Sequence, residues 1–159
     1  MWSYYGGENM KKDHSLRAAE LFVNGCNCSQ AVFVAFAEDC GIDEKTAMRL
    51  SSSFGGGMGR LREVCGAVTG MFMVAGLLAG YENTDPKENK DEHYKLIQAL
   101  AEEFNQVHGT YICRDLLGTV GKSSPVSDPR TAQYYKTRPC VKFVITASEI
   151  LDKHFFNEL

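Results

Sequence analysis

The residues of this chain that are best suited to chemistry are its six cysteines. A chain of 159 residues can bury enough apolar surface to fold without disulfide bonds, so the cysteines are not needed as covalent links. The N-terminal segment has no apolar stretch behind a basic start, and we therefore expect a cytoplasmic protein with reduced thiols. Reduced thiols in such number bind metals, undergo redox cycles or fill a hydrophobic core.

Four of the cysteines stand where the pattern of apolar residues predicts that helices begin, namely Cys28, Cys65, Cys113 and Cys140. Unpaired backbone N–H groups and the positive end of the helix dipole stabilise a thiolate at such a position and lower its pKa. Nearby positive charges, those of Arg60, Arg62 and Arg114, act in the same direction if their side chains point inward. We therefore expect Cys65 to be alkylated early near neutral pH.

Cys40 has a weaker claim to function than the other cysteines. Cys40 precedes Gly41 at a predicted helix end, and we expect it to be a buried structural residue that reacts slowly. Cys26 forms a C-x-C pair with Cys28, but no paired C-x-x-C spacing of the kind found in zinc ribbons, ferredoxins or thioredoxins occurs. A functional site therefore requires that cysteines from distant segments converge.

A glycine-rich segment, FGGGMGR at residues 54–60, precedes Cys65. Glycine at this density predicts an irregular loop with positive φ angles. Backbone N–H groups of such a loop could hold an anion or a cofactor, or could approach a thiolate or cluster sulfur. The candidate binding residues are Gly55, Gly56, Gly57, Arg60 and Gly66. The segment lacks the G-K-[ST] ending of a nucleotide-binding P-loop.

Charge and hydropathy exclude two classes of partner. The formal net charge of −3 offers no basic surface for nucleic acid. Residues 64–81 carry no charge, but this stretch is short for a membrane span and contains several glycines, which favours a buried helix of a soluble domain.

Helical periodicity and end signals run through the chain from Asp13 to the C-terminus, with no strand pattern and no internal repeat. We expect an N-terminal extension at 1–12 and one all-α domain at 13–159, a bundle of five to seven helices around a central, apolar, glycine-rich helix. The predicted helices cover residues 13–25, 29–41, 43–50, 65–80 and 86–108, a short segment from Cys113, and the chain from Pro139. Residues 118–139 are expected to form a long polar connection.

Four sequence segments resemble the C_GCAxxG_C_C family of redox-active cysteine proteins. They are NCSQAV around Cys28, FGGGMGR leading into CGAVTG at Cys65, CRDLLG at Cys113, and Cys140 before an apolar helix. The resemblance implies that these four cysteines are the family's functional set and that Cys26 and Cys40 lie outside it. Family members are often associated with oxidoreductase or transporter genes.

The sequence therefore predicts a redox-active protein, an oxidoreductase or an electron-transfer accessory protein with a redox partner protein. Its four cysteines would serve either as a dithiol that cycles with a disulfide or as thiolate ligands of zinc or an iron–sulfur cluster. Two alternatives belong to other classes. One is a non-catalytic binding module in which the glycine-rich loop holds an anion or ligand, and the other is a homodimer with structural cysteines.

Overall fold

Helix ends in this protein are set by a few capping side chains. The computed structural model describes residues 12–157. The side chain of Asn27 accepts a hydrogen bond from the backbone of Gln30, whose side chain accepts one from the backbone N–H of Asn27, and this capping box starts α2 (Cys28–Ala35). Asp43 caps α3 (Glu44–Ser51), as predicted. Gly25 follows α1 (Ser15–Val23) at φ +113°, which confirms the predicted stop.

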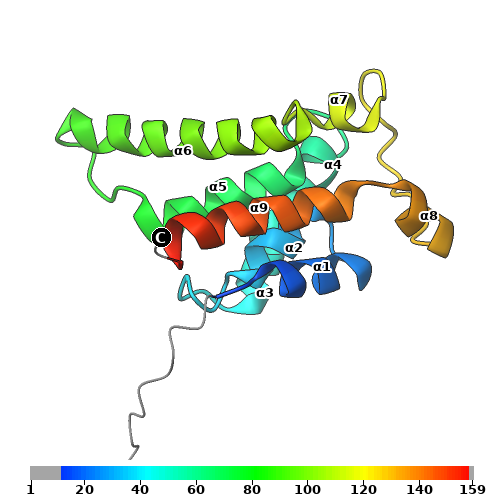
Figure 1. Ribbon diagram of the computed structural model, residues 1–159, viewed down its shortest axis with the longest axis horizontal. Coiled ribbons are helices and arrows are strands. Elements are labelled where there is room, and N and C mark those ends of the chain that lie inside the picture. Colours follow the sequence, from blue (N-terminus) through cyan, green and yellow to red (C-terminus); the bar gives the residue numbers. More distant parts are fainter. Residues whose placement is uncertain (1–11, 158–159) are drawn as a thin grey trace, which may run out of the picture.

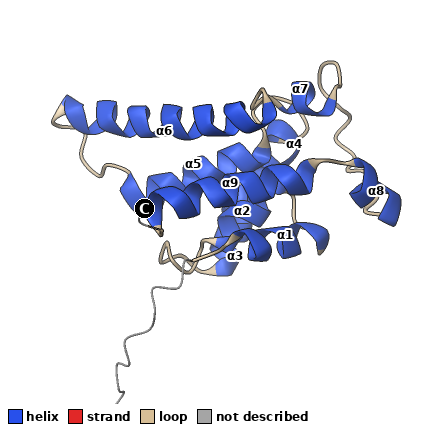
Figure 2. Ribbon diagram, viewed as in Figure 1, coloured by secondary structure: helices blue, strands red, loops and turns tan. Residues whose placement is uncertain are grey.

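The prediction of a single all-α domain is confirmed, since residues 12–157 form helices and connections without a β-strand (Figures 1 and 2). The predicted 118–139 connection contains a short helix, α8, that the sequence analysis missed; the Thr131 side chain caps it. The predicted extension at 1–12 lies, apart from Lys12, outside the described residues. The elements after α3 are η1 (Ser52–Phe54), α4 (Gly55–Met58), α5 (Gly66–Ala79), α6 (Lys87–His108), α7 (Cys113–Leu117), α8 (Ala132–Thr137) and α9 (Cys140–Phe155).

The core lies where α2, α5 and α9 pack together, with α1 against α2 and α9 and with α6 against α5 and α9 (Figure 1). Apolar side chains spaced along these helices are removed from water, which is the main favourable contribution to folding. The largest fully buried ones include Phe22, Phe33, Phe36, Phe104, Met71, Leu100 and Leu151. Because α2 and α9 both begin with cysteine, this packing also sets the positions of two sulfur atoms.

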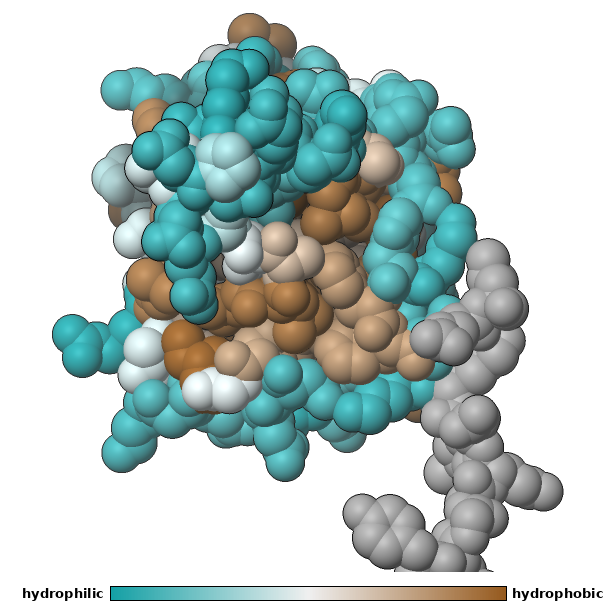
Figure 3. Space-filling view, turned by 90° about the vertical axis from the view of Figure 1, so that its left-hand side faces the viewer, coloured by the Kyte–Doolittle hydropathy of each residue, from teal (hydrophilic) through white to brown (hydrophobic). Residues whose placement is uncertain are grey.

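The apolar helix α5 reaches the surface at its C-terminal end. Its buried residues lie between Gly66 and Ala75, whereas the Leu77 side chain is 50% exposed. On the side of the molecule where α6 begins, apolar residues form a band between polar ones (Figure 3). The homodimer built on this helix stays a prediction. No helix within residues 12–157 combines the length and the hydropathy needed to cross a bilayer.

A partly buried histidine connects the start of α1, the turn after α2 and the C-terminal part of α9. His14 lies 2.5 Å from Asp152 Oδ1 through Nδ1 and 2.6 Å from Asp39 Oδ2 through Nε2, and its ring stacks on Phe36. Its backbone N–H also donates to Asp152, and Lys12 pairs with Asp39. Burial lowers the pKa of His14, but hydrogen bonds and charges from Asp152 and Asp39 outweigh it and raise the pKa overall.

We expect this contact, the His14 clamp, to make the protein less stable in mildly alkaline solution. A histidine whose pKa is raised on folding stabilises the fold fully below its unfolded pKa of about 6.5, and this stabilisation is lost as pH rises through the higher folded value. Urea unfolding at a series of pH values should show this loss. His14→Gln should be less stable at acid pH and should lack that part of the pH dependence; an unchanged profile would contradict the assignment.

Candidate functional site

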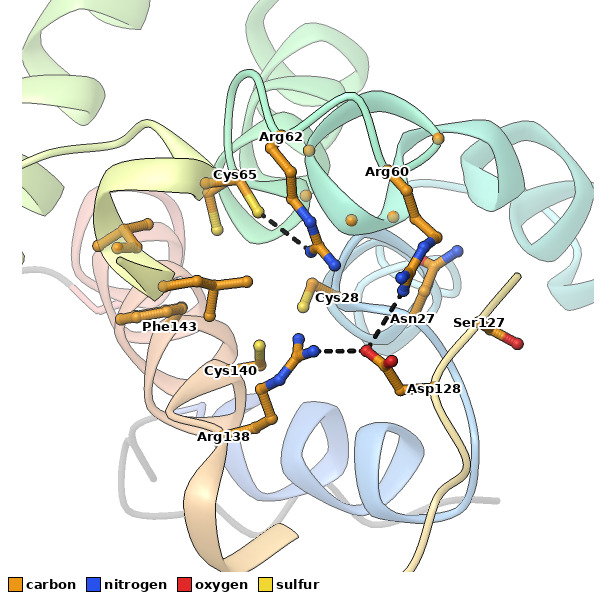
Figure 4. Close-up of a pocket in the computed structure, with 18 of the residues that line it drawn as sticks. Asn27, Cys28, Arg60, Arg62, Cys65, Ser127, Asp128, Arg138, Cys140 and Phe143 are labelled. Atoms are coloured by element: carbon orange, nitrogen blue, oxygen red, sulfur yellow. Dashed lines mark hydrogen bonds and ion pairs between the residues drawn. The ribbon is translucent and has the colours of Figure 1, made fainter. Parts of the chain in front are cut away.

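The predicted convergence of the four cysteines is confirmed. Cys28, Cys65, Cys113 and Cys140 line one cavity of about 260 Å³ between the glycine-rich segment, α2, α5, α9 and the connection before α9. The sulfurs of Cys28 and Cys140 face each other in it, with Arg62 and Arg138 on either side (Figure 4). The candidate residues Gly55, Gly56, Gly57, Arg60 and Gly66 line the same cavity. Their role in binding a cofactor stays a prediction.

All four cysteines lie at helix N-termini, as predicted. Cys28, Cys113 and Cys140 are the first residues of α2, α7 and α9, and Cys65 is the N-cap of α5. All four are buried, with exposed fractions between 3% and 9%. All four cysteines share burial and a position at a helix N-terminus. The contacts of each sulfur therefore determine which thiol has the lowest pKa.

The Cys28 and Cys140 thiols interact directly with each other in the cavity. The Cys28 S–H donates a hydrogen bond to the Cys140 sulfur, and this lowers the pKa of Cys140. Burial opposes the effect, but the charge and hydrogen bond of Arg138 and the charge of Arg62 reinforce it, so the pKa of Cys140 falls to about 7. The same contact with Cys140, together with burial, raises the pKa of Cys28 well above its ordinary value. Of the two thiols, Cys140 is therefore the one that ionises more readily.

The prediction that Cys65 is the reactive thiolate is wrong. Backbone N–H groups of Ala67 and Val68 do face its sulfur, as a helix N-terminus requires, and they favour the thiolate. Burial outweighs them and raises the pKa of Cys65 to about 12. Arg62 donates to Cys113 Sγ at 3.5 Å and also lowers the pKa of Cys140.

The two cysteines outside the family pattern also lie outside the cavity lining. Burial is the main cause that raises the pKa of Cys26, and burial followed by the charge of Asp39 raises that of Cys40 to about 11. Both pack against the hydrophobic core. The position of Cys40 against the core and outside the cavity agrees with the expectation that it is a structural residue.

An arginine network surrounds the sulfurs. Asp128 Oδ2 accepts from Arg60 Nη1 at 3.3 Å and also pairs with Arg138 (Figure 4). Arg114, which the sequence analysis grouped with Arg60 and Arg62, instead pairs with Glu63 at 3.1 Å and does not line the cavity.

The connection before α9 supplies site residues that sequence reasoning missed, namely Asp128, Arg130, Tyr134 and Arg138. Arg130 lies over the Phe22 and Tyr134 rings and donates to the carbonyl oxygens of Phe22 and Cys26. Arg138 could have been recognised from the sequence as a candidate site residue, because it precedes Cys140 by only two residues. No comparable signal marks Asp128 or Arg130, since the connection has no periodic pattern.

The glycine-rich segment folds with a left-handed backbone, which confirms the prediction of positive φ angles. Gly56, Gly57 and Gly59 have φ between 60° and 69°, and so do the non-glycine residues Met58, Arg60 and Arg62, with φ between 61° and 69°. The interior of α4 is therefore not regular α-helix. Left-handed conformation costs a non-glycine residue about 1–2 kcal/mol. Such strained backbone occurs at functional sites, where the chain holds side chains in one fixed arrangement. Here the left-handed backbone directs Arg62 into the cavity.

Two glycines also allow close packing beside the cysteines. A Cβ atom at Gly57 would lie 2.6 Å from the Cβ of Cys113 and 2.9 Å from the backbone of Arg62. One at Gly66 would lie 2.9 Å from the carbonyl oxygen of Phe54 and 3.3 Å from Cys28 Cβ. Gly57 therefore lets the glycine-rich segment approach α7, and Gly66 lets the start of α5 approach α2 and η1, in both cases beside a cysteine.

The cysteine cavity does not form a ready metal site. Within residues 12–157, no three His, Cys, Asp or Glu side chains are grouped so that they could hold a metal ion together. The arrangement instead pairs Cys28 with Cys140 and places Arg62 beside Cys113. Zinc or iron–sulfur binding stays a prediction, to be tested by metal analysis of protein purified without oxygen.

The Cys28 hydrogen bond can be tested by comparing two small substitutions. Alkylation of Cys140 by iodoacetamide, followed by peptide mass spectrometry, should have a pH midpoint near 7 in the wild type. Cys28→Ala should raise the midpoint by roughly one to two pH units, because a donor to the thiolate is lost. Cys28→Ser retains an O–H donor and should change it less. Equal midpoints in the three proteins would contradict this origin of the lowered pKa.

The glycine-rich segment can be tested with a matched pair of glycines. Gly57→Ala should destabilise the protein by about 2–5 kcal/mol, because a side chain there is strained at positive φ and overlaps Cys113. In α5, Gly76 has open space around its Cβ position, so Gly76→Ala should stabilise by about 0.5–1 kcal/mol. Urea unfolding measures both. A Gly57→Ala protein as stable as the wild type would show that the segment adapts freely.

A comparison with protein families gives a match to this chain. The model of a family described as "Putative redox-active protein (C_GCAxxG_C_C)" matches residues 26–154. No curated protein and no solved structure matches the chain. The matched span includes the paired cysteines, the glycine-rich segment and the arginines of the cavity. Because the match covers most of the chain, the protein belongs to the C_GCAxxG_C_C family.

Proposed function

We propose that this protein is a thiol–disulfide redox protein in which Cys140 is the nucleophile and Cys28 is the resolving thiol. The observation that carries the proposal is that the Cys28 and Cys140 sulfurs face each other in one cavity beside Arg62 and Arg138, where the contact with Cys28 lowers the pKa of Cys140 to about 7. A thiol with a pKa near the ambient pH combines a large thiolate fraction with good nucleophilicity. The family's description as redox-active supports the same chemistry.

The reaction begins when the Cys140 thiolate attacks one sulfur of a substrate disulfide. A Cys140–substrate S–S bond forms, the substrate S–S bond breaks, and one substrate thiolate leaves. The Cys28 sulfur then attacks Cys140 and releases the second substrate thiolate, and the proton of Cys28 passes to a leaving thiolate. Two electrons have moved from the protein to the substrate, and the protein holds a Cys28–Cys140 disulfide. The reverse sequence oxidises a dithiol substrate.

The other two cysteines of the cavity support this pair in different ways. Cys65, whose pKa is about 12, remains a neutral thiol and adds no negative charge near Cys140. The Cys113 sulfur accepts a hydrogen bond from Arg62, which keeps that guanidinium beside the pair. The proposal therefore gives the redox step to Cys28 and Cys140 alone, and treats the redox partner as a separate question.

Disulfide mapping after mild oxidation tests the proposal. Reduced protein is equilibrated with oxidised and reduced dithiothreitol, free thiols are blocked with iodoacetamide, and peptides are analysed without reduction. We expect one Cys28–Cys140 disulfide, with Cys26 and Cys40 blocked as free thiols. Cys140→Ser should abolish the disulfide, because the nucleophile is lost. Cys26→Ser is the matched control and should oxidise as the wild type does.

Three results would contradict the proposal. A disulfide that joins a different pair would refute the assignment of Cys28 and Cys140. Stoichiometric iron or zinc in protein purified without oxygen, lost on replacement of the cavity cysteines, would favour a metal site. A protein that keeps its function after all four replacements would be a binding module with structural cysteines.

A further inference from the structure

The lining of the cysteine cavity is strongly basic in a protein whose net charge is −3. One carboxylate, that of Asp128, faces four guanidinium groups there, those of Arg60, Arg62, Arg130 and Arg138. Asp128 pairs with Arg60 and Arg138, and Arg130 is held by aromatic rings and backbone carbonyl oxygens. The four positive charges therefore exceed the one carboxylate charge by three, or by two when Cys140 is a thiolate, and the local potential attracts anions.

Arg62 has the most unusual environment of the four. It is 3% exposed, and it makes no ion pair with a carboxylate among the residues that the structure describes. Its Nε donates to Ser123 Oγ at 2.9 Å and its Nη1 to Cys113 Sγ at 3.5 Å. The Nη2 group has no hydrogen-bond acceptor within residues 12–157, and the side chain points toward Cys28 and Cys140 (Figure 4).

A guanidinium in a largely buried position that faces no carboxylate is a favourable place for an anion to bind. The Cys140 thiolate provides some of the negative charge near Arg62, since the charge of Arg62 is one cause of the lowered pKa of Cys140. The Cys140 sulfur does not take up the Nη2 hydrogen-bond donors of Arg62, which a guanidinium uses to bind a carboxylate. The structure therefore contains an unused binding group at the position where a substrate meets the nucleophile.

The burial of the sulfurs limits the size of the substrate. Cys28 and Cys140 are only 9% and 7% exposed, and the cavity measures about 260 Å³. Pockets for drug-sized ligands are about 300–1,000 Å³. A disulfide within a folded protein is attached to two bulky chains, whereas a small molecule can enter the cavity and bring its sulfur to Cys140.

We propose that the substrates of this site are low-molecular-weight disulfides that carry a carboxylate close to the S–S bond, with Arg62 binding the carboxylate while Cys140 attacks the sulfur. The inference rests on the proposed dithiol function. In the first exchange a Cys140–substrate S–S bond forms, the substrate S–S bond breaks and one thiolate leaves. In the second, Cys28 attacks Cys140, the Cys140–substrate bond breaks, and the carboxylate-bearing thiolate that leaves takes the proton of Cys28. The arginines also stabilise the negative charge that develops on that leaving sulfur.

Two alkylating reagents of almost equal size test the preference for anions. Iodoacetate carries a carboxylate next to the reacting carbon, and iodoacetamide is its neutral counterpart. The ratio of their rates at Cys140, measured at pH 7 by peptide mass spectrometry, cancels the thiolate fraction common to both reactions. We expect this ratio to be roughly tenfold higher in the native protein than in the urea-unfolded chain, which corresponds to one charge-assisted hydrogen bond.

Matched variants assign the preference to Arg62. Arg62→Gln should lower the native ratio by roughly tenfold, since the guanidinium that binds the carboxylate is removed. Arg49→Gln, on the exposed face of α3, changes the net charge equally and should leave the ratio unchanged. If Arg62→Gln does not fold, the comparison of native with unfolded wild type still decides the question.

The outcomes separate the two proposals. If Cys140 reacts with iodoacetamide but its ratio equals that of the unfolded chain, the anion preference is refuted and the dithiol function stands. If Cys140 reacts with neither reagent, the dithiol function is refuted, and thermal unfolding in sodium acetate at fixed ionic strength decides on the anion. A midpoint raised by acetate in the wild type but not in Arg62→Gln supports a carboxylate site. No rise, or a rise with sodium sulfate alone, overturns it.

Discussion

The site depends on the contact between two buried sulfurs, those of Cys28 and Cys140. Two adjacent buried thiols do not both ionise near neutral pH, because the second negative charge would lie beside the first in a medium of low dielectric constant. The contact raises the pKa of Cys28 and lowers that of Cys140, so Cys140 is the thiol that ionises more readily. The surrounding elements produce this difference between the two pKa values. α2 and α9 place the sulfurs, the left-handed glycine-rich segment brings Arg62 to them, and the connection before α9 adds Arg138.

Much of this arrangement could be predicted from local sequence. Asp43 and Gly25 mark helix ends through a side-chain cap and a left-handed backbone, and both are effects of a few neighbouring residues. The positions of four cysteines at helix starts follow from the same signals. The density of glycine at residues 54–60 predicts positive φ angles, because only glycine takes such angles without strain.

The rest depends on tertiary packing, which no local pattern encodes. Cys65 has the N-cap position that favours a thiolate, but the surrounding helices bury it so deeply that desolvation reverses the sign of its pKa change. Cys140 was not distinguished from it, since its advantage comes from Cys28, more than 100 residues away in the chain. Asp128 and Arg130 belong to a connection without periodicity, and only the fold places them beside the sulfurs.

The His14 clamp has a mechanical consequence for the distant sulfurs. α2 and α9 each begin at a cysteine of the pair, and the carboxylates beyond or near their other ends, Asp39 and Asp152, grip the same imidazole ring. His14 therefore fixes α2 and α9 relative to each other at one end, and the two cysteines lie at the opposite end. Displacement of one helix along its axis relative to the other would move the Cys28 and Cys140 sulfurs out of alignment, and the His14 contacts oppose such a displacement during the disulfide exchange proposed above.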